Sequence, residues 1–254
     1  MKIQSKSRIT GVFFGFIFFA TSLPSLAAVS VTTYDSDDEW RNAFGTNWTK
    51  YYGSNVRAGN NATTGDWERG IVDGNDQPLA QGQQNWGSES NFSFDFQHYN
   101  NGSTVNATQS IQDLADDSWE SELETSLTSV FNHHDTAPNT VVLRAKGTEG
   151  RGSITLDLES LKFDSRGYLD LSGTSLTGDA DGQYLVFTGL EMSEIFSLRG
   201  IASLTIGEDF RGSDPMFQIK VGYFEAPVPI PAAFWLFGSA LVGLFFAGRR
   251  NRCH

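Results

Sequence analysis

Alternation of apolar and polar residues with a period of two recurs along the chain and predicts β-strands. The clearest example is 91–99, where phenylalanines at 92, 94 and 96 are separated by polar residues. Such a strand has one buried face and one face in water. The segment 29–34 alternates in the same way. Asn101-Gly102 is a strong hairpin signal, so we expect 104–111 to be the strand that returns from it.

From residue 140 onward the pattern repeats as strand, glycine or aspartate turn, strand. We expect strands at 140–145, 152–158, 168–172, 183–190, 197–206 and 216–223, and loops with short strands between 45 and 91. Turns at spacings of about 8–15 residues are typical of an all-β sandwich or barrel. The fold class that we predict is mainly β, a jelly-roll-like β-sandwich over residues 28–225.

Two segments show a helical period instead. Residues 118–131 begin at a suitable N-cap, Ser118, and place one apolar stripe opposite glutamates that face water; the stripe consists of Trp119, Leu123, Leu127, Val130 and Phe131. We therefore predict a helix over 118–131. A shorter helix is expected at 35–44, where Trp40 and Phe44 lie four residues apart on one face.

The first 27 residues have the three parts of a secretory signal peptide. Lys2, Lys6 and Arg8 form the basic region, and 11–20 is an apolar run of ten residues. Small residues precede the junction of Ala27 and Ala28, where we expect cleavage. The sequence therefore predicts export through the Sec pathway.

The last part of the chain, 226–254, predicts a temporary membrane anchor. Prolines at 227, 229 and 231 make a stiff, extended strip, because each fixes φ and restricts the residue before it. The 16 residues of 232–247 carry no charge and would span roughly 24 Å as a helix, a little less than a hydrocarbon core of about 30 Å. Trp235 suits the outer interface, and arginines at 249, 250 and 252 would stay in the cytoplasm.

This tail resembles the PEP-CTERM sorting signal. The residues that carry the resemblance are Val228, Pro229, Pro231, Ala232, Trp235, Gly238, Leu241, Arg249 and Arg250, with Ile230 between the two prolines. The resemblance implies a Gram-negative bacterium, processing by an exosortase-type transpeptidase at the inner membrane, and a final place on the cell surface or in an exopolysaccharide-rich biofilm matrix. Ile230 is a departure, because the name-giving motif has Glu there. Residues 28–225 are also similar in pattern to the choice-of-anchor β domains.

Charge and cysteine content narrow the partners of the exported part. All 30 acidic residues lie in 28–225 with 12 of the 18 basic ones, so its formal charge is 12 − 30 = −18. This charge argues against nucleic acid and anionic lipid as partners. The single cysteine, Cys253, lies in the tail, so the exported part has neither disulfides nor a thiol nucleophile.

Asp179 and Asp181 precede a glycine, as carboxylates do in some calcium loops, but position twelve is Leu190 and the complete loop motif is absent. A hairpin turn is the alternative. His133 and His134 suggest either a metal or base site or an exposed helix end. Ca²⁺ is thus a candidate cofactor. Apart from Ca²⁺, we expect the protein to bind no cofactor.

Trp67 and Trp86 are candidates for stacking against sugar rings, although tryptophans are also ordinary core residues of β-sandwiches. The sequence contains no nucleophile elbow, phosphate loop or zinc-protease helix motif. We therefore expect a structural or adhesive protein that is not an enzyme. Two alternatives stay open: an exopolysaccharide-binding module, and a carbohydrate-active enzyme that uses a pair of carboxylates.

Overall fold

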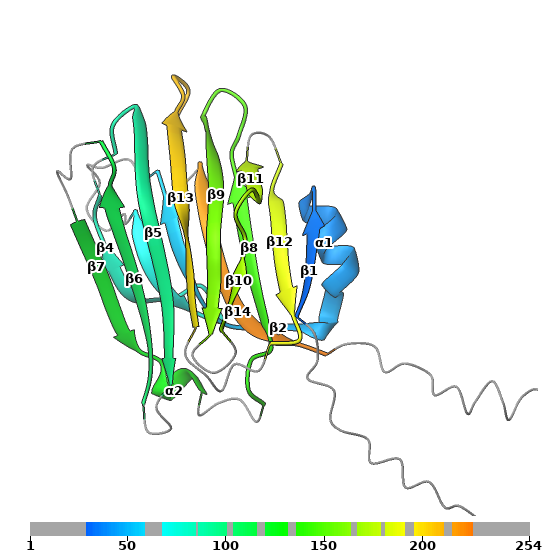
Figure 1. Cartoon of the computed structure of the whole chain (residues 1–254). Helices are drawn as coiled ribbons and strands as arrows, with labels where there is room; N and C mark the ends of the chain where they lie inside the picture. Colours follow the sequence, from blue (N-terminus) through cyan, green and yellow to red (C-terminus); the bar gives the residue numbers. More distant parts are fainter. Residues whose placement is uncertain are drawn as a thin grey trace, which may run out of the picture.

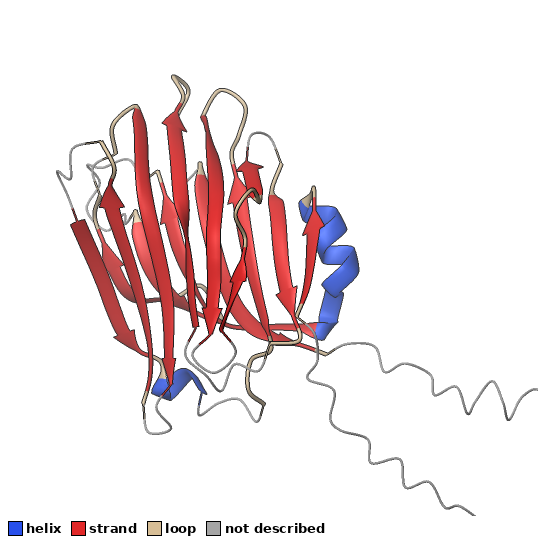
Figure 2. Cartoon of the chain, in the orientation of Figure 1, coloured by secondary structure: helices blue, strands red, loops and turns tan. Residues whose placement is uncertain are grey.

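The computed structural model describes residues 29–58, 68–84, 86–100, 104–115, 120–131, 136–163, 167–178, 181–190, 196–210 and 215–225. Over these residues two antiparallel β-sheets face each other as a sandwich, with a short helix against one side (Figure 1, Figure 2). The prediction of a mainly β protein built as a sandwich is confirmed.

The first sheet, here called sheet I, contains both the first and the last strand. Its order is β1 (Ser30–Tyr34), β12 (Gln183–Thr188), β8 (Thr140–Lys146), β14 (Met216–Phe224), β2 (Trp48–Arg57), β3 (Arg69–Asp73) and β4 (Pro78–Gly82). The helix α1 (Asp37–Phe44) and the 3-10 turn η1 (Gly45–Asn47) connect β1 to β2.

Sheet II is the other layer. Its order is β10 (Gly167–Asp170), β9 (Gly152–Phe163), β13 (Phe196–Ile206), β5 (Glu89–Asn100), β6 (Val105–Asp113) and β7 (Glu120–Ser126), and β11 (Ser175–Gly178) also pairs with β9. From β8 onward the chain alternates between layers: β9, β10 and β11 lie in sheet II, β12 in sheet I, β13 in sheet II and β14 in sheet I. Each sheet thus receives a late strand between two earlier ones.

The core lies between the sheets and follows from the alternation in the sequence. Phe92, Phe94 and Phe96 of β5 are buried, as the period of two predicts. The ring of Phe94 lies 5.0 Å from that of Phe217, which reaches it from β14 in the opposite sheet. Burial of such rings supplies most of the stabilisation of a fold without disulfides.

Polar ties also cross between the layers. Tyr52 of β2 hydrogen-bonds His98 Nδ1 of β5 over 2.7 Å through its hydroxyl group. Gln109 Nε2 of β6 donates to Ser54 Oγ of β2 over 2.6 Å. Burying a polar group without a hydrogen-bond partner costs free energy. These bonds therefore favour the one alignment of sheet II on sheet I in which they can form.

Most of the expected elements are present. Strands were predicted at 29–34, 91–99, 104–111 and at six places after residue 140, and a strand occupies each of these regions. The predicted helix at 35–44 is confirmed as α1, where Ser36 is the N-cap and accepts a hydrogen bond from Glu39 N.

The helix predicted over 118–131 is wrong. Residues 120–126 form β7, paired antiparallel with β6, and only Thr128–Phe131 forms the helix α2. The glutamates at 122 and 124 are exposed while Leu123 between them is partly buried, so the same residues also satisfy a period of two. Backbone hydrogen bonding to β6 selects the strand over the helix.

The region 45–91 contains more regular structure than expected. β2 is a ten-residue strand with a β-bulge, at which Val221 of β14 pairs with Tyr52 and Gly222 pairs with Lys50, so that Tyr51 is the extra residue. Both tyrosines are buried, so strict alternation is lost and the strand was not recognised. The short strand β11 was also missed.

The predicted signal peptide with its cleavage site at Ala27 and Ala28, and the predicted sorting signal at 226–254, lie outside the described residues. Within the residues that are described, no helix is long and apolar enough to cross a bilayer.

Replacing Phe96 by Ala should lower the free energy of unfolding by about 3–5 kcal/mol, because loss of the buried ring would leave a cavity between the sheets. The control is Tyr168→Ala, whose side chain is 71 % exposed and which should change stability by less than about 0.5 kcal/mol. Urea denaturation measures both. Equal effects of the two substitutions would contradict the position of the core.

Candidate functional site

The helix α1 covers one end of the outer face of sheet I. Phe44 on the helix packs on Val142, Tyr184 and Val186, which project outward from β8 and β12 as a second, smaller apolar cluster. Trp40, one turn earlier, stacks on the ring of Tyr184 at 5.2 Å with an interplanar angle of 5°. The helix is therefore fixed by aromatic packing.

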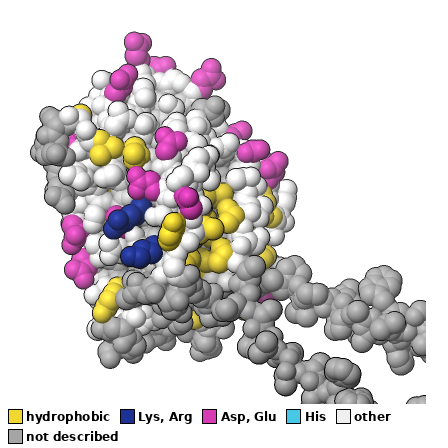
Figure 3. Space-filling view, viewed as in Figure 1, with side chains coloured by type: hydrophobic (Ala, Val, Ile, Leu, Met, Phe, Trp, Pro, Cys, Tyr) yellow, Lys and Arg dark blue, Asp and Glu magenta, His cyan; other side chains and the backbone are white. Residues whose placement is uncertain are grey.

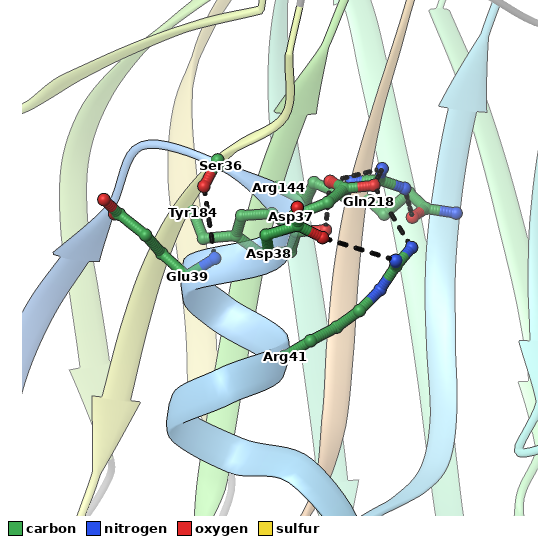
Figure 4. Close-up of polar contacts among 8 residues, drawn as sticks. All are labelled: Ser36, Asp37, Asp38, Glu39, Arg41, Arg144, Tyr184 and Gln218. Atoms are coloured by element: carbon green, nitrogen blue, oxygen red, sulfur yellow. Dashed lines mark hydrogen bonds and ion pairs between the residues drawn. The ribbon is translucent and has the colours of Figure 1, made fainter.

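The first turn of α1 adds a charged contact (Figure 4). Arg144 of β8 approaches both carboxylate oxygens of Asp37 through Nη2, at 2.7 Å each. The hydroxyl group of Tyr184 donates to Asp37 Oδ1 over 2.7 Å. Arg144 Nη1 in turn donates to Gln218 Oε1 of β14 over 3.2 Å. This network holds the guanidinium group in one position over the sheet.

The same contacts set the protonation of the acid. Burial would raise the pKa of Asp37, but the hydrogen bond from Tyr184 and the charge of Arg144 outweigh it and lower the pKa below its usual value. Burial, and next the hydrogen bond to Asp37, raise the pKa of Tyr184. At neutral pH the network therefore consists of a carboxylate, a guanidinium ion and a neutral phenol.

Beside this network the outer face of sheet I is hollowed into a pocket of about 360 Å³, hereafter the basic pocket. Its lining residues are Asn55, Arg57, Asp76, Arg144, Met216, Gln218 and Lys220. The strand register places Arg144, Gln218 and Asn55 in one row across β8, β14 and β2. Lys220 lies in the next row, opposite Gly53, where a Cβ atom would be only 2.8 Å from Ile219 O.

Lys220 is the most unusual residue of the pocket. Its Nζ atom lies 5.3 Å from the ring centre of Trp40, in a cation–π contact. It forms no ion pair within the part of the chain that the structure describes. Burial, together with the positive charges of Arg144 and Lys50, lowers its pKa to about 8. Asp76, which would oppose this shift, is in an ion pair with Lys50.

The charge of this face differs from that of the domain. Arg57, Arg144, Lys146 and Lys220 all project from its central strands, although the formal charge of 28–225 is 12 − 30 = −18. The face of sheet II that Figure 3 shows is different, because Asp and Glu side chains are spread over it around a few basic ones. The basic pocket therefore brings several cationic side chains together on an otherwise acidic protein.

Sheet II has a smaller hollow of about 250 Å³ on its outer face, beside the β-bulge at Arg199 and Gly200. Asp95 lies in it and accepts hydrogen bonds from Ser197 Oγ over 2.7 Å and from Arg199 Nε over 2.9 Å. Glu159 also lines it. Because the carboxylate of Asp95 is already paired with a cation, this hollow is the weaker candidate for ligand binding.

The structure changes the interpretation of one residue chosen from the sequence, Trp86, and shows the position of another, Asp181. Trp86 is only 4 % exposed, and its indole N–H donates to Arg57 O over 3.0 Å. It belongs to the core and offers no ring face to a sugar, so its proposed stacking role is corrected. Asp181 is exposed in the turn before β12.

Other predicted site residues lie outside the described residues. These are Trp67, Asp179, His133, His134, and the tail residues Val228, Pro229, Ile230, Pro231, Ala232, Trp235, Gly238, Leu241, Arg249 and Arg250. Among the residues that the structure describes, no group of three or more His, Asp and Glu side chains could hold a metal ion. The calcium prediction at Asp179 and Asp181 stays a prediction.

The residues of the basic pocket were not identified from the sequence. Gln218 and Lys220 are the polar members of an alternating strand whose buried members are Phe217, Ile219 and Val221, and this pattern does show which way they point. The pattern does not show that Arg144 and Asn55 lie beside them, since these residues come from strands far away in the sequence.

Comparison with known proteins adds no assignment: no protein-family model matches the chain, and no curated protein shows significant similarity to it.

Replacing Asp37 by Asn should lower the unfolding free energy by about 1–3 kcal/mol at pH 7, because Arg144 loses its carboxylate partner in a half-buried place. Since the folded pKa of Asp37 is lowered, its contribution exists above the unfolded pKa and is lost as pH falls through the folded value. The wild type should therefore lose more stability than D37N on acidification below pH 5. Asp38→Asn, at a side chain 88 % exposed, is the control and should be nearly neutral.

Replacing Lys220 by Met should stabilise the protein at pH 7 by about 1–3 kcal/mol, since the folded state holds the lysine proton less tightly than the unfolded chain. The folded pKa is about 8 and the ordinary value 10.5. Between these values the unfolded state binds more protons, so the wild type should gain stability as pH rises from 8 toward 10. K220M should lack this gain. If the denaturation midpoints of the wild type and K220M changed with pH in parallel, this would count against a lowered pKa of Lys220.

Proposed function

We propose that this chain is an exported protein of a Gram-negative bacterium, tethered for a time to the inner membrane and then delivered to the cell surface or the biofilm matrix. An exosortase-type transpeptidase processes its tail, and its role is structural or adhesive. The observation that carries this proposal is the tripartite tail, with Val228, Pro229, Ile230 and Pro231 before an apolar run and Arg249 and Arg250 after it. The last described strand, β14, ends at Phe224, just before this tail.

For the fold we propose the jelly-roll type of β-sandwich. The strand neighbours β2, β14, β8 and β12 in one layer and β5, β13, β9 and β10 with β11 in the other support it, together with the repeated crossing between layers. The remaining strands extend the two sheets at their edges. Sandwiches of this kind occur in lectin and capsid domains, so the architecture is compatible with a binding or structural role, and the choice between functions rests on the site.

Exopolysaccharide binding is the second candidate function, and the basic pocket favours it. The pocket combines amide and cationic side chains, which can hold a polar ligand by hydrogen bonds and charge. Its carboxylate, Asp76, is paired with Lys50 and is therefore poorly placed to act as a general base. The pocket thus supports binding more than glycoside hydrolysis.

Replacing Pro229 and Pro231 together by Ala should leave the unprocessed chain in the inner membrane, because the rigid strip that the processing enzyme meets would be lost. Fractionation with immunoblotting of wild type and variant measures this. Pro138→Ala, in the folded domain, is the control and should be processed normally. Unchanged release of the double variant would refute the processing step.

A further inference from the structure

We propose that the basic pocket on the outer face of sheet I binds carboxylate-bearing sugar units of an acidic polysaccharide. Lys220 is the residue that pairs with the carboxylate, and Gln218 and Asn55 bind hydroxyl groups. This inference rests on the proposed function in one respect only: on the cell surface or in the biofilm matrix the protein would meet such a polymer. The assignment itself rests on the pocket.

The first reason is the size and position of the pocket. Its volume of about 360 Å³ lies within the range of about 300–1,000 Å³ that is typical of ligand sites. It is lined by three neighbouring strands of sheet I and by Asp76 of the turn between β3 and β4. Because it lies on the outside of the sheet, a long polymer could enter it without any opening of the sandwich.

The second reason is the state of Lys220. A partly buried ammonium group without a carboxylate partner is costly, and such costs are tolerated where a ligand supplies the missing charge. Nζ of Lys220 lies over the face of Trp40, which attracts the cation but does not neutralise it. A bound carboxylate would raise the pKa of Lys220 from about 8 toward its ordinary value.

The third reason is the pre-organised polar row beside Lys220. Asp37 fixes Arg144, and Arg144 occupies Gln218 Oε1, so the amide group of Gln218 is held with one orientation. Asn55 follows in the same row and is only 8 % exposed. Side-chain amides both donate and accept hydrogen bonds, as sugar hydroxyl groups do. The row therefore matches a ligand that carries hydroxyl groups beside its acid.

The surrounding charge selects between acidic polymers. The formal charge of −18 on 28–225 repels a densely charged nucleic acid or an anionic bilayer approaching the domain as a whole. A polysaccharide with one carboxylate on each sugar unit is less densely charged and can place a single group in the pocket. Met216 provides an apolar patch on the pocket wall against which the C–H face of a sugar can pack.

The test is binding of fluorescent oligosaccharides of a polyuronate, such as alginate, to the purified full-length chain in detergent with EDTA, with dextran oligosaccharides as the neutral probe. At pH 7 we expect K220M to weaken polyuronate binding by about tenfold or more, which is the order of effect of losing a charge-assisted hydrogen bond. The matched control is Lys162→Met, which removes one charge from an exposed position on sheet II and should change the affinity by less than about twofold.

The pH dependence provides a readout that a structural role would not give. The wild-type affinity should be constant below pH 8 and fall above it, as Lys220 loses its proton in the free protein. K220M should lack this dependence. K220R should keep binding at pH 9.5, because a guanidinium group does not titrate there. A denaturation midpoint for each variant shows that it is folded.

Several results would overturn the proposal. Equal losses in K220M and K162M would mean that general charge attraction binds the polymer. Equal affinity for dextran would mean that the carboxylate is not recognised. Poly-glutamate is measured in the same assay as a third probe, and equal affinity for it would mean that an acidic peptide fits as well as a sugar. Because the assay uses purified protein, failure of the tail to be processed in cells leaves its outcome unaffected, and loss of binding leaves the processing proposal unaffected.

Discussion

The fold depends on the burial of one face of each sheet against the other. No disulfide can assist, because the single cysteine lies at 253, and within the described residues no cluster of ligands could hold a metal ion. Rings such as Phe94 and Phe217, which meet at 5.0 Å from opposite sheets, therefore supply the main stabilisation. Tyr52 with His98, and Gln109 with Ser54, add directional bonds across the same layer. Apolar contact alone would allow the sheets to slide, whereas these bonds favour one register.

This use of the inner faces leaves the outer faces for function. The two outer faces differ, because α1 builds a ridge on sheet I and places an acid against Arg144, while sheet II carries its own paired charges around Asp95. The ridge borders the basic pocket, and its Asp37 fixes the guanidinium group of Arg144 at the rim of the pocket. Lys220 has no such carboxylate partner among the described residues, and burial lowers its pKa to about 8. The energetic cost of that arrangement marks the pocket as the place where the domain is not optimised for stability alone.

The sequence predicted the sandwich well where one rule decided the structure, and poorly where two rules competed. The alternation of Phe92, Phe94 and Phe96 with polar residues predicted a strand with one buried face, and the spacing of Trp40 and Phe44 predicted a short helix. Residues 120–126 satisfy both a helical stripe and a strand alternation, and the choice was made by β6, which no local pattern reveals. The basic pocket was missed for the same reason: Arg144, Gln218 and Asn55 become neighbours only through strand pairing across long separations. Trp86 was misjudged because composition does not distinguish a buried indole from an exposed one.

The topology also bears on how a tethered domain would be held. The proposed tail follows β14, and β14 is hydrogen-bonded along its length to β8 on one side and to β2 on the other. β1, by contrast, pairs with β12 alone among the strands that the structure describes. A load applied at Glu225 would have to break two ladders of backbone bonds together, whereas an edge strand would be released by breaking one. Attachment through a central strand, added last and locked between earlier ones, therefore suits a domain that resists force at its C-terminal end while its pocketed face stays open to the surroundings.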